Sequence, residues 1–134
     1  TAGEVRTILA SCCEERERLR PYREAGCEIL ALPERDGRLD LCALMQRLGK
    51  MGIDSILAEG GATLNGSLLQ SGMVNWIQAY IAPKIFGGEA APSPVGGSGA
   101  QAVEDAAALS LASVTRLGDD LLVESEVKRC LQGS

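Results

Sequence analysis

The stretch that decides the fold is Ile53-Asp54-Ser55-Ile56-Leu57-Ala58-Glu59-Gly60-Gly61-Ala62-Thr63-Leu64-Asn65-Gly66-Ser67. Its first six residues are mostly apolar and predict a buried strand. After Glu59 and two glycines, Leu64, Leu68 and Leu69 predict the packed face of a short helix. A carboxylate is therefore expected at the carboxyl end of a strand, where open α/β sheets bind ligands. The helix start that follows offers backbone N–H groups and a positive dipole end, which suit a phosphate.

The local pattern alone leaves two alternatives open. The Gly60-Gly61 turn also fits an ordinary strand–helix connection, because its glycine spacing differs from G-x-G-x-x-G and no lysine follows Gly66 as in a P-loop. Glu59 is either solvated, or capping the following helix, or it accepts hydrogen bonds from amino or hydroxyl groups of a ligand. An unpaired buried carboxylate would be costly, so its environment decides between these hypotheses.

Alternating strand and helix patterns extend on both sides of this stretch. Strands are expected at residues 5–10, 27–32 and 74–82, the last one buried with Trp76 and Tyr80. A charged helix is expected over 14–20, ended by Pro21, with Gly26 as a C′ residue before the next strand. An amphipathic helix is expected from Asp40 to Gly49. This order predicts an α/β fold with a mostly parallel sheet flanked by helices.

The C-terminal part has a different character. Residues 84–99 form a glycine- and proline-rich loop, long enough to predict a functional role. Lys84 could meet a phosphate there, although an exposed lysine is the ordinary interpretation. Gly87-Gly88 and Gly96-Gly97 could let the backbone approach a ligand. Residues 109–116 and 121–127 predict an antiparallel hairpin appended to the sheet.

Composition excludes several classes of function. The chain has 134 residues, enough for a single domain over residues 1–134, and its apolar content of 46% predicts a folded protein. A net charge of −5 and 3% aromatic residues argue against nucleic-acid binding. No apolar run approaches the roughly 20 residues that span a bilayer, and no signal peptide opens the chain, so we expect no membrane contact and a cytoplasmic location.

The chain contains no histidine, which excludes Ser-His-Asp and Cys-His catalysis and any zinc site with histidine ligands. Its five cysteines are odd in number and lack a C-x-x-C pair, so no metal site is expected. We interpret them as reduced thiols, mostly small core residues: Cys12, Cys13, Cys27, Cys42 and Cys130.

Taken together, these pieces resemble the reductase domain of the bifunctional riboflavin-biosynthesis deaminase/reductase. The resemblance covers nearly the whole chain, and its strand–Pro-Lys–Gly-Gly element is fairly specific. It is carried by four stretches, residues 52–64, 67–74, 80–88 and 116–121.

The resemblance implies a dihydrofolate-reductase-like fold with a C-terminal antiparallel hairpin. It also implies NADPH as cofactor and reduction of the ribosyl group of 5-amino-6-(5-phosphoribosylamino)uracil, a small-molecule substrate, to a ribityl group. The residue matching Glu59 contacts substrate in this family, and Gly60 serves shape only. No catalytic residue is assigned. The cofactor contacts implied are Gly61, Ala62, Thr63, Leu64, Asn65, Gly66 and Ser67.

The resemblance covers only the C-terminal portion of the reductase domain and no deaminase domain. We therefore expect a chain that is inactive alone and that forms a homo-oligomer or associates with the N-terminal part. Two other functions stay open: a non-catalytic nucleotide-binding or assembly domain, and a related reductase of the same fold acting on another pyrimidine or pteridine. A purely structural module has no reason to hold a carboxylate at Glu59, so this residue distinguishes the reductase from a non-catalytic domain.

Overall fold

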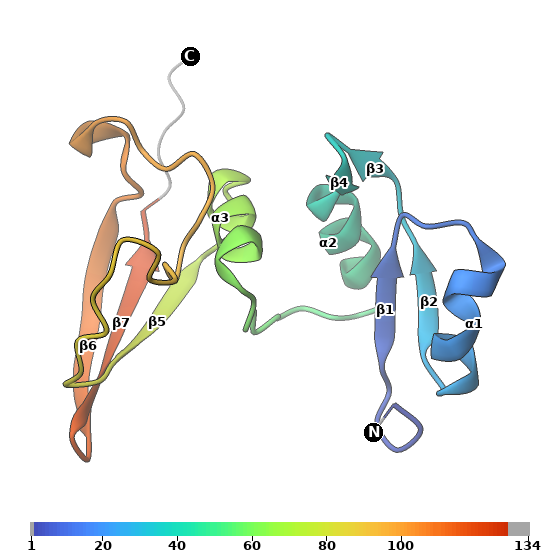
Figure 1. Ribbon diagram of the computed structural model, residues 1–134, viewed down its shortest axis with the longest axis horizontal. Helices are drawn as coiled ribbons and strands as arrows, with labels where there is room; N and C mark the ends of the chain where they lie inside the picture. Colours follow the sequence, from blue (N-terminus) through green and yellow to red (C-terminus); the bar gives the residue numbers. More distant parts are fainter. Residues whose placement is uncertain (1, 129–134) are drawn as a thin grey trace. The chain divides into compact units, whose positions relative to one another are not determined.

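The chain divides between Leu57 and Ala58 into two units. The structure, a computed structural model, describes residues 2–128. The first unit holds the elements β1 to α2 and the second holds α3 to β7 (Figure 1). Whether residues 1–134 act as one domain, as the sequence predicts, stays a prediction.

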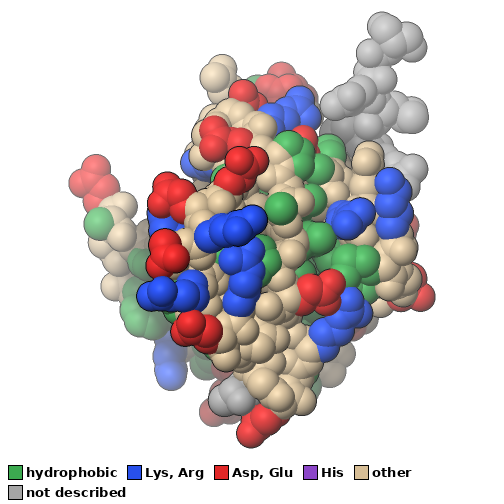
Figure 2. All heavy atoms as spheres, turned by 90° about the vertical axis from the view of Figure 1, so that its right-hand side faces the viewer, with side chains coloured by type: hydrophobic (Ala, Val, Ile, Leu, Met, Phe, Trp, Pro, Cys, Tyr) green, Lys and Arg blue, Asp and Glu red, His purple; other side chains and the backbone are tan. Residues whose placement is uncertain are grey.

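The first unit is built on a parallel strand pair. β1 (Ile8–Ser11) pairs with β2 (Glu28–Ala31), and α1 (Arg16–Glu24) connects them. Leu19 of α1 and Leu30 of β2 are buried, so the helix packs its apolar residue on the sheet. The opposite side of the helix is charged, and Figure 2 shows acidic and basic side chains interspersed on the face that carries it. Both predicted strands are confirmed, with shorter bounds.

Helix α1 continues through Pro21, so the prediction that Pro21 ends it is wrong. Proline has no N–H and therefore leaves the carbonyl of Glu17 without its helical partner. Only one backbone bond is lost, and Glu17 is exposed, so water can satisfy its carbonyl.

Among residues 2–128, each α-helix is followed by a glycine in the left-handed region, which confirms the C′ residue predicted at Gly26. These glycines are Gly26, Gly52 and Gly72, with φ of 92°, 81° and 68°. In α2 (Leu41–Lys50), Gly52 N–H donates to the Gly49 carbonyl at 3.0 Å and Ile53 N–H to the Leu48 carbonyl at 3.1 Å, a Schellman arrangement. The predicted end at Gly49 is therefore wrong, because the residue that adopts positive φ lies three positions later.

A small hairpin precedes α2 where the sequence shows only a polar turn. β3 (Glu34–Arg35) pairs with β4 (Arg38–Leu39) across Asp36 and Gly37. Both turn residues have positive φ, 54° and 74°, as a type I′ turn requires. Asp40 then caps α2, accepting the N–H of Ala43 at 3.0 Å, which confirms the predicted start.

The segment from Ile53 to Ala58 forms no strand, and the prediction of a buried strand there is wrong. Leu57 is 74% exposed. A strand satisfies its backbone only by pairing with another strand, and none of the strand pairs among residues 2–128 includes this segment. The parallel pairing expected of the whole sheet is accordingly seen only between β1 and β2.

The second unit begins with α3 (Ala62–Gln70) and continues into an antiparallel sheet of order β5-β7-β6. β5 spans Trp76–Ile81, and the short 3₁₀ helix η1 spans Val103–Asp105. β6 (Leu109–Leu117) and β7 (Asp120–Val127) form the predicted C-terminal hairpin, which is confirmed. The predicted helix after Gly61 is also confirmed.

Burial in the second unit is sparse. Leu68 of α3 is 6% exposed, but Leu64 is exposed and does not belong to a packed face as predicted. Trp76 and Tyr80 are also exposed, so the prediction that residues 74–82 are buried is wrong. Both rings project from one face of β5 by the two-residue alternation of a strand, and no helix covers that face at their positions.

The thiols are free but are not core residues as predicted. Cys12 and Cys42 are exposed, while Cys13 and Cys27 are half-buried; Cys130 lies outside the described residues. None of the helices in residues 2–128 combines the length and the apolar character needed to cross a bilayer.

Candidate cofactor and substrate site

The predicted site lies at the start of α3. Glu59 is exposed in the irregular segment before the helix, two residues ahead of the N-cap residue Gly61. Gly61 has extended backbone angles, φ −74° and ψ 172°. The carboxylate is thus accessible to a ligand, and the solvated alternative for Glu59 also fits this position.

The first turn of α3 has free backbone donors. No side chain caps the helix, because the N-cap residue is glycine. The first helical backbone bond comes from Asn65 N–H to the Gly61 carbonyl, at 3.1 Å. The N–H groups before Asn65 therefore have no partner within the helix, and with the helix dipole they provide a place for a phosphate.

Two polar side chains of the predicted cofactor segment, those of Asn65 and Ser67, form hydrogen bonds inside the protein. Asn65 Nδ2 donates to the carbonyls of Gly60 at 3.1 Å and Pro94 at 3.0 Å. The Ser67 hydroxyl donates to the Thr63 carbonyl at 2.9 Å. These contacts leave the backbone amides of the first turn, together with the hydroxyl of the exposed Thr63, as the groups available to an anion.

The glycine-rich loop folds back onto α3. Gly96 N–H donates to the Ala62 carbonyl at 2.8 Å. A methyl group added to Gly66 would collide with the carbonyl oxygen of Gly96. Glycine at position 66 thus permits α3 and the loop to touch, and the hypothesis that Gly96-Gly97 approaches a ligand stays a prediction.

The two glycines of the turn differ in their surroundings. A Cβ atom at Gly60 would overlap the side chain of Leu64, whereas a Cβ atom at Gly61 would meet nothing within 4 Å. Gly60 is therefore required by local shape, and Gly61 borders open space. That space lies beside the free N–H groups, so the turn has both the donors and the room that a cofactor phosphate needs.

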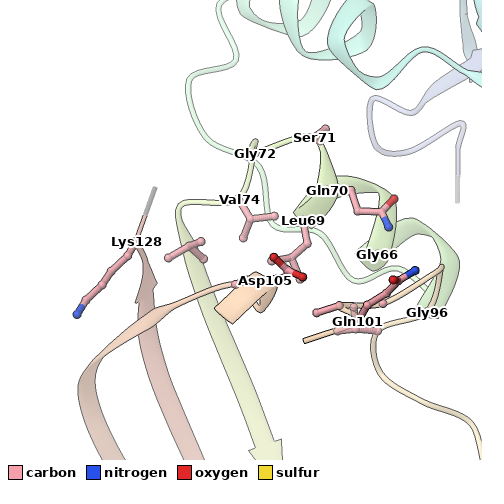
Figure 3. Close-up of a pocket in the computed structure, with 15 residues that line it drawn as sticks. Gly66, Leu69, Gln70, Ser71, Gly72, Val74, Gly96, Gln101, Asp105 and Lys128 are labelled. Carbon is pink, nitrogen blue, oxygen red and sulfur yellow. The ribbon is translucent and has the colours of Figure 1, made fainter. Parts of the chain in front are cut away.

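A cavity of about 790 Å³ lies elsewhere, between the C-terminal half of α3 and the loop that precedes β6 (Figure 3). Of the residues that the sequence analysis proposed for ligand contact, Gly66 and Gly96 line it. Its polar lining includes Gln70, Gln101 and Asp105, while Lys128 directs its amino group away from α3. Sequence reasoning missed this cavity because a loop without regular structure forms one wall.

The other candidate residues that the structure describes, which follow β5, are not hydrogen-bonded to the predicted site. Among the described residues, no hydrogen bond links Lys84, Gly87 or Gly88 to Glu59 or to residues 61–67. Lys84 is exposed, and its N–H bonds to the Ala82 carbonyl at 2.8 Å. Within residues 2–128, no group of three potential metal-ligating side chains is present.

Comparison with known proteins identifies the family of this chain. Residues 1–123 match the family described as the RibD C-terminal domain. The chain belongs to this family. The riboflavin biosynthesis protein RibD of Actinobacillus pleuropneumoniae is 43% identical over 124 residues, which are 92% of this chain and 33% of that protein.

A second relative of this chain is a shorter protein than the first. The 2,5-diamino-6-ribosylamino-4(3H)-pyrimidinone 5′-phosphate reductase of Aquifex aeolicus is 34% identical over 125 residues, covering 92% of this chain and 55% of the relative. The chain therefore spans about a third to about half the length of these relatives. Membership of a reductase family supports a pyridine nucleotide cofactor in general and a small-molecule substrate.

Solved structures confirm the fold. Acinetobacter baumannii RibD superposes with a TM-score of 0.73 at 22% identity, over 91% of this chain and 31% of that one. A pyrimidine reductase-like protein of Corynebacterium diphtheriae gives 0.69 at 20% identity, over 92% and 50%. The predicted α/β fold class of the RibD reductase, with its antiparallel hairpin, is thereby confirmed.

Proposed function

We propose that this chain supplies part of the active site of a riboflavin-biosynthesis reductase that uses NADPH. The substrate is 5-amino-6-(5-phosphoribosylamino)uracil or a closely related pyrimidine, and its ribosyl group is reduced to ribityl. The observation that carries the proposal is the uncapped start of α3 directly after Glu59-Gly60-Gly61, in a member of the RibD C-terminal domain family. When bound, the cofactor supplies the hydride.

The role proposed for α3 is to hold the pyrophosphate of the cofactor. The backbone N–H groups of Ala62, Thr63 and Leu64 would donate to it, and Gly61 would leave room for it. Asn65 and Gly66 would act indirectly, because their contacts with Pro94 and Gly96 fix the loop beside the helix. The segment from Gly61 to Ser67 would then act through its backbone amides, with the hydroxyl of the exposed Thr63 as a further donor.

Glu59 would orient the substrate. Its carboxylate is exposed at the entrance to the turn, where it can accept hydrogen bonds from amino or hydroxyl groups of the pyrimidine. A fixed negative charge there would also stabilise positive charge that develops on the substrate during reduction.

Association with other polypeptide is part of this proposal. On one face of the second unit's sheet, Ile81, Leu111 and Val114 are exposed apolar side chains. Exposed apolar area of this kind is typical of a surface that another chain, or another part of the same enzyme, covers. We propose a homo-oligomer or a complex with the N-terminal part of the reductase.

The test is a kinetic comparison in an enzyme of the relatives' full length that contains these residues. Glu59→Gln should lower kcat/KM for reduction of the phosphoribosylaminopyrimidine by at least about tenfold, as expected for losing a charged contact of about 1.4 kcal/mol. Glu34→Gln, an exposed carboxylate of β3, is the matched control and should leave the rate unchanged. Equal rates for wild type and Glu59→Gln would remove Glu59 from the mechanism.

A further inference from the structure

A hydrogen-bonded carboxylate lies at the middle of the second unit's sheet. Glu124 is on β7, between β5 and β6. The register places Gln78 opposite it on one side and Ser113 on the other. Gln78 Nε2 donates to Glu124 Oε1 at 3.1 Å, and the Ser113 hydroxyl donates to Glu124 Oε2 at 2.7 Å. Donors from both neighbouring strands thus hold this carboxylate in one orientation.

The same face carries two exposed aromatic rings. Trp76 lies opposite Glu126 in the register, and Tyr80 lies opposite Leu122. Trp76 is 48% exposed and Tyr80 65% exposed. Side chains two residues apart share a face, so the rings and both carboxylates point to the same side. We call this surface the carboxylate face; it consists of Trp76, Gln78, Tyr80, Ser113, Leu122, Glu124 and Glu126.

The carboxylate face carries the negative charges of Glu124 and Glu126. Hydrogen bonds from Ser113, then Gln78 and Trp76, lower the pKa of Glu124 against a smaller opposing effect of burial, so the group is ionised at neutral pH. In the part of the chain that the structure describes, neither Glu124 nor Glu126 forms an ion pair. Glu126 is exposed beside it.

These features select one kind of partner. A second copy stacked through the same face would bring like charges together, which is unfavourable. A purely apolar partner would bury charges without compensation. A guanidinium group bonds to a carboxylate through two parallel N–H donors and also stacks on aromatic rings, so it matches both features of this face.

We propose that the carboxylate face binds an arginine-bearing segment of a partner polypeptide. Glu124 and Glu126 are two residues apart on one strand, a separation of about 6.8 Å along it. Two arginines separated by one residue in an extended segment have the same spacing. The fixed orientation of Glu124 favours binding, because less side-chain entropy is lost when the arginine docks.

The test uses the fluorescence of Trp76, which is the only tryptophan of the chain. The chain is titrated with the peptide acetyl-Arg-Ala-Arg-amide at low salt, and with the same peptide in which both arginines are replaced by neutral citrulline. The arginine peptide should change Trp76 emission in a saturable way, and the citrulline peptide should bind at least tenfold more weakly. Higher salt should weaken the arginine complex.

Variants locate the site. Glu124→Gln should weaken binding at least fivefold, with Glu126→Gln as a second variant in case the first perturbs the sheet. Glu104→Gln, an exposed carboxylate in η1, should bind like wild type. An unchanged Trp76 emission up to 10 mM peptide (roughly the weak limit of a single ion pair), equal binding of the citrulline peptide, or equal weakening by Glu104→Gln would overturn the proposal.

Discussion

Two neighbouring segments whose sequences both predict regular structure behave differently in this protein. Residues 53–58 have the apolar pattern of a strand but form none, whereas residues 62–70 have a weaker apolar face and form α3. A helix satisfies its backbone groups within itself, apart from its ends. A strand depends on a partner that lies elsewhere in the sequence. The comparison teaches that α3 pairs its interior backbone groups within itself, while a strand at 53–58 requires a neighbouring strand to pair its backbone.

The largest expected effect on stability comes from the difference in burial between the two segments. Leu68→Ala should lower the free energy of unfolding of the second unit by about 3 kcal/mol, because it removes a buried side chain. Leu57→Ala lies in the first unit and should change the free energy of unfolding of that unit by less than about 0.5 kcal/mol, since this side chain is exposed. Urea denaturation followed by Trp76 fluorescence measures the first variant, and far-UV circular dichroism, which also reports the helices of the first unit, measures the second.

The same two variants can show that the two segments do not differ in packing. A cost of more than about 2 kcal/mol for Leu57→Ala, similar to that of a buried leucine, would mean that residues 53–58 pack as a strand in solution.

A smaller effect is expected where the loop touches α3. Gly66→Ala would bring a methyl group onto the Gly96 carbonyl, so we expect a loss of about 1–2 kcal/mol despite the better helix propensity of alanine. Gly61→Ser is the control, because its side chain enters open space and can cap the helix. Denaturation of the two variants shows whether α3 depends on the loop; a stabilising Gly66→Ala would contradict the contact.

The smallest expected effect concerns pH. The pKa of Glu124 is lowered in the folded protein, so its contribution to stability is fully present above the ordinary glutamate pKa of about 4.3. That contribution is lost as pH falls through the lowered value. The stability difference between wild type and Glu124→Gln should therefore shrink between pH 6 and pH 3 (roughly the range of carboxyl titration).

Unfolding curves of the second unit at several pH values measure this difference. A constant difference for Glu124→Gln would mean that the hydrogen bonds of Glu124 do not favour its charged form.

Local signals in the sequence predicted the parts of the fold that depend on nearby residues. Asp40 caps α2, Gly61 begins α3, and the hairpin turn at residues 118–119 forms where expected. The predictions that failed depend on distant partners: the strand at 53–58 and the burial of Trp76. In the site, the sequence indicated the turn and Glu59, but not that Asn65 reaches Pro94. That contact joins residues 29 positions apart, which no local pattern reveals.

The central claim is that the free N–H groups at the start of α3 bind the phosphates of NADPH. Gly61→Asp and Gly61→Asn test it most directly, because both side chains fit the open space and cap the helix, and only aspartate adds a negative charge. Titration calorimetry with NADPH on an enzyme of the relatives' full length measures the affinity. We predict that Gly61→Asp binds NADPH at least about tenfold more weakly than Gly61→Asn, as about 1.4 kcal/mol of charge repulsion implies. Equal affinities for the two variants would contradict the claim.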